Sequence, residues 1–481
     1  MTTRNLVQKI WSFCDTLRDD GLGYTDYLEQ LTYLLFLKMA DENRQKYDLP
    51  DICDWQQFVK LSGGELQDQY EKILILLGRS GGMLEKIFAG AQNKIHDSSK
   101  LKKLITLINE EDWSATGFDI KGEIYESLLQ KNAESSGAGQ YFTPRPVIQA
   151  IVECIRPQRF QTIADPSCGT GGFFLGALDF LTSQGNLSQE EMDFLRFKTF
   201  HGWEIERATA RLCLMNLYLH GIGDLRKTPD IHVVDSLKAQ IDQQFDLVLA
   251  NPPFGKSSSD IPTNDEGQAK KDGFFLRKDF WITTGNKQLA FLQHIVSLLK
   301  SGGQAAVVLP DNVLFEGGAG ETIRRQLLEQ YNLHTILRLP TGIFYAHGVK
   351  ANVLFFEKVK RKLSAKNHVW IYDYRTNIHH TLKKNPLRFQ HLQEFVKVFS
   401  AQNMTKRRET WSEENPLGRW RKFAVVDILN SEKANLDLIW LPSEGSIDFG
   451  RLPEADDLVE DIIENIESAL VNFRTLRDSL H

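Results

Sequence analysis

Hydrophobic residues in the first quarter of the chain recur at helical spacing. In the segment YLEQLTYLLFLKMADE, Leu28, Leu31 and Leu35 fall at three- and four-residue steps and therefore share one face of a helix. No convincing alternation of apolar and polar residues, which is typical of strands, interrupts this pattern. The pattern predicts a helical region over residues 1–131.

The pattern changes after the Gly- and Ser-containing stretch NAESSGAG at 132–139. From there, short apolar segments typical of strands alternate with helical segments, an order that predicts a doubly wound, mostly parallel sheet. The predicted strands lie in the segments QTIADPS, KTFHGWEI, DIHVVDSL, FDLVLANPP, GGQAAVVLPD, HTILRLP and NVLFFEKV. The last two leave no room for a crossover helix between them, so the final strand is predicted to insert antiparallel.

The expected fold class is therefore α/β, with an N-terminal helical domain, a doubly wound, mostly parallel seven-stranded sheet that has one antiparallel strand, and a C-terminal helical tail. A chain of 481 residues exceeds what a single hydrophobic core usually supports. We place the domains at 1–131 and 139–358, followed by an ill-defined extension at 359–453 and an amphipathic helix at 454–481. The apolar seam of that helix must be buried, and we expect it to dock against helices of a partner subunit, with packing on the chain's own body as the alternative.

Composition and charge exclude several classes of protein. A formal net charge of -6 argues against coating of nucleic acid by charge alone, so a DNA contact would be local or shared with a partner. The five cysteines have no C-x-x-C spacing, which disfavours a disulfide framework and a structural zinc site. The opening residues have no apolar signal core, and the densest apolar run, YLLFLKMA, is too short to cross a bilayer. We therefore expect a cytoplasmic protein without a metal site or a membrane segment.

The segment DLVLANPPFG predicts a strand with an unusual end. Two prolines cannot continue a sheet ladder, so the strand must stop at Asn251. In open α/β sheets, ligands bind at the carboxyl ends of the strands, and the prolines would hold the Asn251 amide and the Phe254 ring in fixed directions. A planar, polar group could be bound there.

Three further strand ends carry groups that suit a nucleoside. Gly169, Gly171 and Gly172 would let the backbone approach a ligand closely, although they do not form a G-x-G-x-x-G fingerprint. Glu204 follows the next strand, where a carboxylate can accept hydrogen bonds from both hydroxyls of a ribose. Asp235 follows the third, where it could accept from an exocyclic amine. The set favours a cofactor that contains adenosine and needs no pyrophosphate site.

These segments together resemble a known family, the S-adenosylmethionine-dependent amino-methyltransferases that act on DNA. The resemblance is greatest to the modification subunit of type I restriction-modification systems, and it covers most of the chain. The matching segments, in chain order, are GFDIKGEIYESLL, GQYFTPRPV, DPSCGTGGF, GWEIE, VVDSL, NPPF and LRLPTGIFYAHGVKANVLFFEK.

The resemblance implies S-adenosylmethionine as the cofactor and assigns residues to it. Thr143 resembles the hydroxyl that holds the methionine carboxylate, in a pocket lined by two aromatic residues that precede it. Asp165 and the glycine loop would cradle the methionine part, while Glu204 and Asp235 would accept from the ribose and the adenine. The residues so assigned are Tyr141, Phe142, Thr143, Asp165, Gly169, Thr170, Gly171, Gly172, Glu204 and Asp235.

The resemblance also makes the block Asn251, Pro252, Pro253 and Phe254 the catalytic one. The exocyclic nitrogen of adenine is a poor nucleophile because its lone pair is delocalised into the ring, so the site must accept hydrogen bonds from that amine. The Asn251 side-chain carbonyl and the Pro252 backbone carbonyl are two such acceptors. Phe254 would stack on a target base flipped out of the duplex.

Two other features suggest contacts with DNA. Phe344 or Tyr345 would either stack on the far face of the target base or pack in the core. The segment 255–288 is long for a loop, and we expect either a flap that orders over DNA with its basic residues on phosphates, or a solvated insertion. The basic residues of this segment that could act in this way are Lys256, Lys270, Lys271, Arg277 and Lys278.

Three other functions remain open at this point: methylation of cytosine N4, methylation of a protein glutamine amide, and a non-catalytic scaffold. No G-x-x-x-x-G-K-[ST] motif occurs, so an ATP-driven activity would lie on another chain. Only about 120 residues follow the last predicted strand, which is little room for a target-recognition domain. The resemblance therefore implies double-stranded DNA and a separate specificity subunit as partners, and it admits a restriction subunit and two copies of this chain per complex.

Overall fold

The computed structural model describes residues 23–42, 49–110, 125–130, 142–224, 227–238, 240–254, 277–344, 349–359, 367–382 and 385–442. The chain divides into two compact units, which are described separately. The first comprises Met1–Phe142 with Cys168–Asp235, and the second comprises Thr143–Ser167 with Ser236–His481. In the described part of the chain, no helix is long and apolar enough to cross a membrane. The domain limits expected from the sequence stay a prediction.

The N-terminal part of the first unit is helical, as its hydrophobic spacing predicts. Its elements are α2 (Tyr24–Glu42), η1 (Asp51–Cys53), α3 (Trp55–Phe58), α4 (Gly63–Leu77), α5 (Gly82–Phe88) and α6 (Ser98–Asn109). Leu28, Leu31 and Leu35 of α2 are all buried. The α6 helix begins after Asp97, whose carboxylate caps the first turn by accepting from the backbone N–H groups of Ser99 and Lys100.

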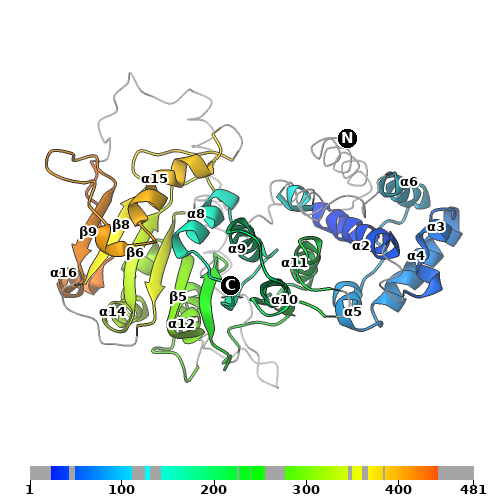
Figure 1. The fold of residues 1–481 in the computed structure, drawn as a ribbon, viewed down its shortest axis with the longest axis horizontal. Coiled ribbons are helices and arrows are strands. Elements are labelled where there is room, and N and C mark those ends of the chain that lie inside the picture. The colour runs from blue at the N-terminus through cyan, green and yellow to red at the C-terminus, as the bar shows by residue number, and fades with distance from the viewer. Residues whose placement is uncertain are drawn as a thin grey trace, which may run out of the picture. The chain divides into compact units, whose positions relative to one another are not determined.

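The remainder of the first unit alternates helices and strands. Its elements are α9 (Gly172–Ser183), α10 (Gln189–Phe197), β2 (Phe200–Trp203), α11 (Arg207–Leu219) and β3 (Asp230–His232), and the two strands pair in parallel. Figure 1 shows α11 beside α2 and α5. Arg211 of α11 makes this contact polar: its guanidinium donates to the Tyr33 hydroxyl at 2.8 Å and pairs with the Glu29 carboxylate. The helical region and this part of the α/β fold therefore share one core.

The second unit carries a larger part of the sheet. Its strands are β1 (Ile163–Asp165), β4 (Phe245–Ala250), β5 (Leu299–Pro310), β6 (Asn332–Arg338), β7 (Ala351–Glu357), β8 (His368–Asp373) and β9 (Trp420–Ala424), in the spatial order β1-β4-β5-β7-β6-β8-β9. Its helices are α8 (Arg145–Ile155), α12 (Lys287–Ser297), α13 (Asn312–Phe315), α14 (Ala319–Gln330), α15 (Phe389–Phe399) and α16 (Val425–Asn430), with short 3₁₀ turns η3 (Met404–Lys406) and η4 (Glu432–Ala434). In Figure 1, α8 and α15 cover one face of these strands, and α12 and α14 cover the other.

The α/β fold class and the antiparallel insertion are confirmed. β7 runs antiparallel to both β5 and β6, with Val307 opposite Leu354 and Ile336 opposite the same residue from the other side. The number of strands is different: the described residues contain nine, because β8 adds in parallel to β6 and β9 adds antiparallel to β8. The expectation of seven strands with one antiparallel strand was wrong, because it ended the sheet at residue 358. β9, WRKFA, is a half-polar edge strand, which gives little hydrophobic signal.

Candidate active site

The catalytic block directly follows a fully enclosed strand. β4 lies between β1 and β5 with its last four residues buried, and it ends at Ala250, one residue before Asn251. The prediction that the prolines stop the strand at this point is confirmed. The Asn251 side chain is thus attached directly after a buried strand that is paired on both sides.

The two ends of the Asn251 amide differ sharply. Its Nδ2 donates to the Thr143 hydroxyl at 3.0 Å. Its Oδ1 is buried and accepts no hydrogen bond within the described structure. A buried acceptor without a donor costs about 1 to 3 kcal/mol, so the position is one where a ligand, a water molecule or a reacting group can supply the missing donor. The prediction that this oxygen accepts from a target amine needs an acceptor of this kind.

The turn after Asn251 is held from α12. The Gln288 amide donates to the Pro253 carbonyl at 3.2 Å, and its side chain is buried. α12 itself begins at a capped end, because the Asn286 carboxamide accepts from the backbone N–H of Gln288 at 3.0 Å. The sequence analysis missed Gln288, and only its place two residues after an Asn cap could have drawn attention to it.

Phe254 meets one of the two aromatic residues that the sequence singled out. The Phe254 and Phe344 rings lie edge to face, with centroids 5.5 Å apart and planes at 83°. Phe344 is buried and belongs to the loop after β6. It is therefore adjacent to the catalytic block, while Tyr345 lies outside the described residues. Stacking of either ring on a base stays a prediction.

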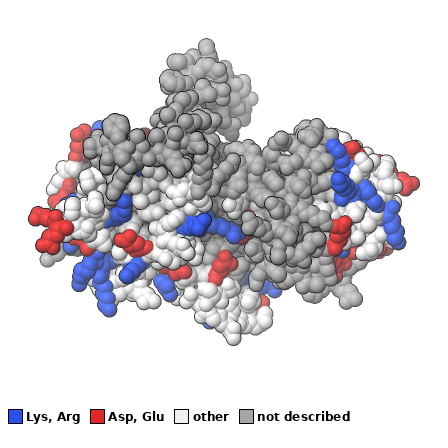
Figure 2. Space-filling model, turned by 90° about the horizontal axis from the view of Figure 1, so that it is seen from above, with Lys and Arg blue, Asp and Glu red and all other residues white. Residues whose placement is uncertain are grey.

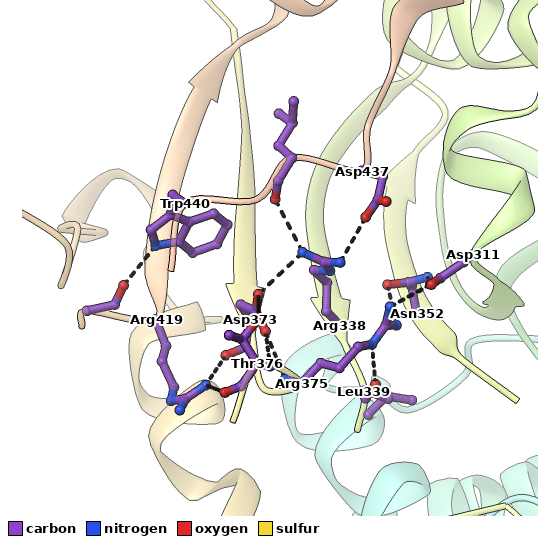
Figure 3. Close-up of polar contacts among 12 residues, drawn as sticks. Asp311, Arg338, Leu339, Asn352, Asp373, Arg375, Thr376, Arg419, Asp437 and Trp440 are labelled. Atoms are coloured by element: carbon purple, nitrogen blue, oxygen red, sulfur yellow. Dashed lines mark hydrogen bonds and ion pairs between the residues drawn. The ribbon is translucent and has the colours of Figure 1, made fainter. Parts of the chain in front are cut away.

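A buried charge network fixes the loop that carries Phe344 (Figure 3). Arg375, just after β8, forms an ion pair with Asp311 at 2.7 Å and donates to the Leu339 carbonyl at 2.8 Å, where the loop begins. Arg338, at the end of β6, lies between the carboxylates of Asp373 at 3.3 Å and Asp437 at 2.8 Å. These pairs join the ends of β5, β6 and β8 and so support the loop. The sequence analysis used LRLP in a predicted strand and in the family resemblance, and it gave Arg338 no role.

In the first unit, Glu204 is bound to the glycine loop. Its carboxylate accepts from the Gly169 backbone N–H at 3.0 Å and from the Glu206 backbone N–H at 2.9 Å. The side chain is buried, and that burial raises the pKa of Glu204 above its ordinary value, against the backbone N–H groups that lower it. Gly171 has a φ of 84°, and a Cβ there would lie 3.1 Å from the Cys213 sulfur, so the loop requires glycine. The structure brings Gly169 and Glu204 together, and their roles in binding a cofactor stay predictions.

The other predicted cofactor residues lie at strand ends. Asp165 ends β1 in the second unit, buried, and accepts from the Ser167 backbone N–H at 3.0 Å. Asp235 lies three residues after β3 in the first unit. Nearby are exposed apolar side chains that the sequence analysis missed, at the ends of β2 and β3: Ile205 (55%), Val234 (53%) and Val233 (40%). Their sequence signal was an apolar residue next to a carboxylate at a strand end, because such a residue could contact the apolar face of a nucleobase.

Several predicted positions cannot be assigned a place. Tyr141, the C-terminal helix at 454–481 and the segment 255–276, which includes most of the proposed flap, lie outside the described residues. Arg277 is described, and the expectation for it was wrong: its side chain is only 5% exposed and forms an ion pair with Asp279 at 2.6 Å. It also donates to His294 at 3.0 Å, so its charge is used inside the fold and not on a phosphate. Lys278 is exposed.

Comparison with known proteins decides the family. The model of the N-6 DNA methylase family matches residues 116–436, and that of the HsdM N-terminal domain matches residues 6–108. Over 521 residues the chain is 39% identical to the type I restriction enzyme StySPI methylase subunit of Salmonella potsdam, with 100% of this chain and 96% of that protein covered. The chain belongs to the type I restriction-enzyme methylase subunits. The resemblance found from the motifs is confirmed.

Solved structures agree with this methylase subunit in fold. A chain solved for the complex assembly and conformational transition of the type I R-M system has a TM-score of 0.74 at 26% identity, with 100% of this chain and 99% of that chain covered. The EcoKI M protein has a TM-score of 0.54 at 34% identity, with 99% and 96% covered. The family places this methylase subunit among adenine-N6 DNA methyltransferases and disfavours cytosine N4 and a protein glutamine as targets.

Proposed function

We propose that this methylase subunit transfers the methyl group of S-adenosylmethionine to the N6 amine of an adenine flipped out of double-stranded DNA. The observation that carries the proposal is the Asn251 amide, whose Oδ1 is buried and unpartnered while Nδ2 is held by Thr143. A preorganised acceptor of this kind suits a group on which positive charge develops during the reaction.

The residues of the chain would act on the amine in the following way. Asn251 Oδ1 and the Pro252 carbonyl accept from its two N–H groups, which draws the lone pair out of conjugation with the ring. S-adenosylmethionine, when bound, would supply the methyl group that the nitrogen lone pair takes, and the methylated amine would release one proton to solvent. The Phe254 ring, set edge to face against Phe344, would hold the base plane.

The donor set fits S-adenosylmethionine, which when bound supplies the electrophilic methyl group. The glycine loop leaves its backbone open to a ligand, because Gly171 has no room for a side chain. Glu204 offers a buried carboxylate for the ribose hydroxyls. We propose that Gly171 and Glu204 bind the cofactor together with Phe142, Thr143, Asp165, Thr170, Gly172 and Asp235. Tyr141, which lies outside the described residues, is assigned to the same site.

Choice of DNA sequence would come from a partner. The relatives that this chain matches are subunits of type I restriction enzymes. On the face seen in Figure 2, Lys and Arg of the described residues lie among Asp, Glu and uncharged residues, so the described residues do not form one continuous basic surface there. We propose a specificity subunit as the partner that selects the site, with two methylase copies per complex and a restriction subunit as a further member.

The test is to copurify the methylase subunit with a specificity subunit from among its neighbouring gene products and to incubate the complex with DNA and labelled S-adenosylmethionine. Nucleoside mass spectrometry should then show N6-methyladenine at one recurrent sequence. Label in N4-methylcytosine, or label in protein and none in DNA, would refute the proposal. The complex with Asn251→Ala is the control for label introduced by contaminating enzymes.

A further inference from the structure

Methyl transfer requires the Asn251 amide to face the target amine with Oδ1 and not with Nδ2, and residues 251–254 do not fix this orientation by themselves. A carboxamide turned by 180° keeps its shape but exchanges its acceptor and its donor. Turned the wrong way, Asn251 would present N–H groups to the N–H groups of a target amine. The side chain therefore needs a neighbour that distinguishes its two ends.

Thr143 is that neighbour, and its position is fixed in advance. It precedes Pro144, which restricts its backbone to extended conformations. The Pro144 carbonyl accepts from the backbone N–H groups of Val147 at 2.9 Å and Ile148 at 3.1 Å, which anchors this turn on the start of α8. Both of these residues are buried. The Thr143 hydroxyl thus reaches Asn251 from a rigid support 108 positions away along the chain.

A hydroxyl by itself does not settle the orientation, because it can donate as well as accept. The Thr143 hydroxyl is restricted to accepting from Asn251 Nδ2 once its own proton has been donated to another acceptor. The family resemblance assigns to Thr143 such an acceptor, the carboxylate of the methyl donor. A carboxylate can only accept, so it would take the hydroxyl proton and leave an oxygen lone pair for Nδ2.

We propose that Thr143 is a positioning residue for methyl transfer. Its hydroxyl donates to the carboxylate of the bound methyl donor and accepts from Asn251 Nδ2, which turns Oδ1 of the same amide toward the target amine. The proposal rests on the proposed function and deepens it. It makes Thr143 necessary for turnover as well as for binding of the donor, and it makes productive recognition of the amine depend on the donor being present.

Three variants separate this role from its alternatives. Thr143→Val has nearly the same shape but no hydroxyl, and Thr143→Ser keeps the hydroxyl and loses a methyl group. Asn251→Asp replaces the carboxamide by a carboxylate with two equivalent oxygens, so that either orientation offers an acceptor. Methyl transfer by the complete methylase complex is measured at saturating S-adenosylmethionine, and the dissociation constant of S-adenosylmethionine is measured by calorimetry.

We expect Thr143→Val to lower kcat at least about tenfold at saturating cofactor, the effect of one ordinary hydrogen bond, and Thr143→Ser to restore it to within about threefold of the original protein. In the Asn251→Asp protein, adding Thr143→Val should change the remaining kcat by less than about threefold. If Thr143→Val weakens cofactor binding and leaves kcat within threefold, the proposal is wrong and Thr143 only binds cofactor.

A loss of kcat that Thr143→Ser does not restore, or a loss from Thr143→Val that is equal with and without Asn251→Asp, would also overturn the proposal, since both indicate a general structural role. The serine and valine comparison decides the matter even if Asn251→Asp has no activity. Failure of the proposed function is distinguishable, because in that case the unsubstituted complex forms no N6-methyladenine in the same assay.

Discussion

Replacing Asn251 by alanine should separate catalysis from stability. The substitution removes Oδ1, an acceptor aimed at the reaction, and breaks the 3.0 Å bond from Nδ2 to Thr143. Loss of one transition-state hydrogen bond of this kind typically raises the barrier by about 2 to 4 kcal/mol, so turnover should fall at least roughly a hundredfold. Binding of S-adenosylmethionine should stay nearly unchanged, because the acceptor serves the target amine.

The effect on folding follows from the same contacts. Losing the bond to Thr143 costs about 0.5 to 1.5 kcal/mol, whereas removing a buried acceptor that has no partner relieves a penalty of about 1 to 3 kcal/mol. The two nearly cancel, so the free energy of unfolding should stay within about 1 kcal/mol of the original value. An Asn251→Ala protein that is as stable as the original and almost inactive is the expected result.

Asn352→Ala is the matched control, since Asn352 is a buried asparagine of the same unit with both ends of its amide occupied. Nδ2 donates to Asp311 at 2.8 Å, and Oδ1 accepts from Arg375 at 3.1 Å. Its removal should cost more stability and less turnover than Asn251→Ala. The two proteins are compared by chemical denaturation and by methyl transfer at saturating cofactor and DNA. Turnover of Asn251→Ala within threefold of the original would refute the catalytic assignment.

Four other predictions follow from the structure. Glu204→Ala should weaken S-adenosylmethionine binding at least about tenfold in calorimetry, because a hydrogen bond to a charged group contributes roughly 1.5 to 3 kcal/mol; an unchanged constant would remove Glu204 from the cofactor site. Arg375→Ala should lower the free energy of unfolding by about 3 kcal/mol, since it removes the cation from the largely buried Asp311 carboxylate and leaves only the hydrogen bond from Asn352. Lys422→Ala, which breaks an exposed ion pair of 3.6 Å, should cost less than about 1 kcal/mol, and equal losses would contradict the role of the network. Burial lowers the pKa of His334 to about 3, so on acidification the unfolded chain binds a proton at this histidine before the folded chain does, and stability falls as the pH drops below about 6.5. Between roughly pH 7.5 and 5.5 this histidine should account for about 1.4 kcal/mol of lost stability. His334→Gln should abolish that loss, and an unaltered pH dependence of unfolding would disprove the prediction. Deleting residues 454–481 should leave a folded protein that binds S-adenosylmethionine but does not join the specificity subunit; normal assembly would show that this helix is not the tether, and unfolding would show that it packs on its own chain.

The sequence by itself determined where the chain must change direction. Two consecutive prolines stop β4 at Asn251, whatever surrounds the strand, and a run of apolar residues without polar alternation marks that strand as enclosed on both faces. Leucines at helical spacing likewise predict α2. These features depend on the torsions and side chains of adjacent residues, so local pattern was sufficient to place the predicted catalytic block at the end of a central strand.

Local pattern failed where a side chain's role depends on its neighbours in space. Arg277 has the sequence context of a surface arginine in a basic loop, yet a carboxylate two positions away and the buried His294 hold it inside the fold. β9 has too few apolar residues to predict a strand, and it pairs only because β8 offers it a free edge.

The direction of the Asn251 amide is the clearest case of what tertiary structure alone decided. The sequence identifies an asparagine at a strand end, but a carboxamide has no intrinsic preference for which of its ends faces a ligand. The folded chain gives the two ends of the amide different surroundings, because the start of α8 brings the Thr143 hydroxyl, 108 positions away, to within 3.0 Å of Nδ2. Bond torsions and side-chain polarity act over a few residues and can be read along the chain, whereas a hydrogen-bond partner is chosen by distance in the folded molecule.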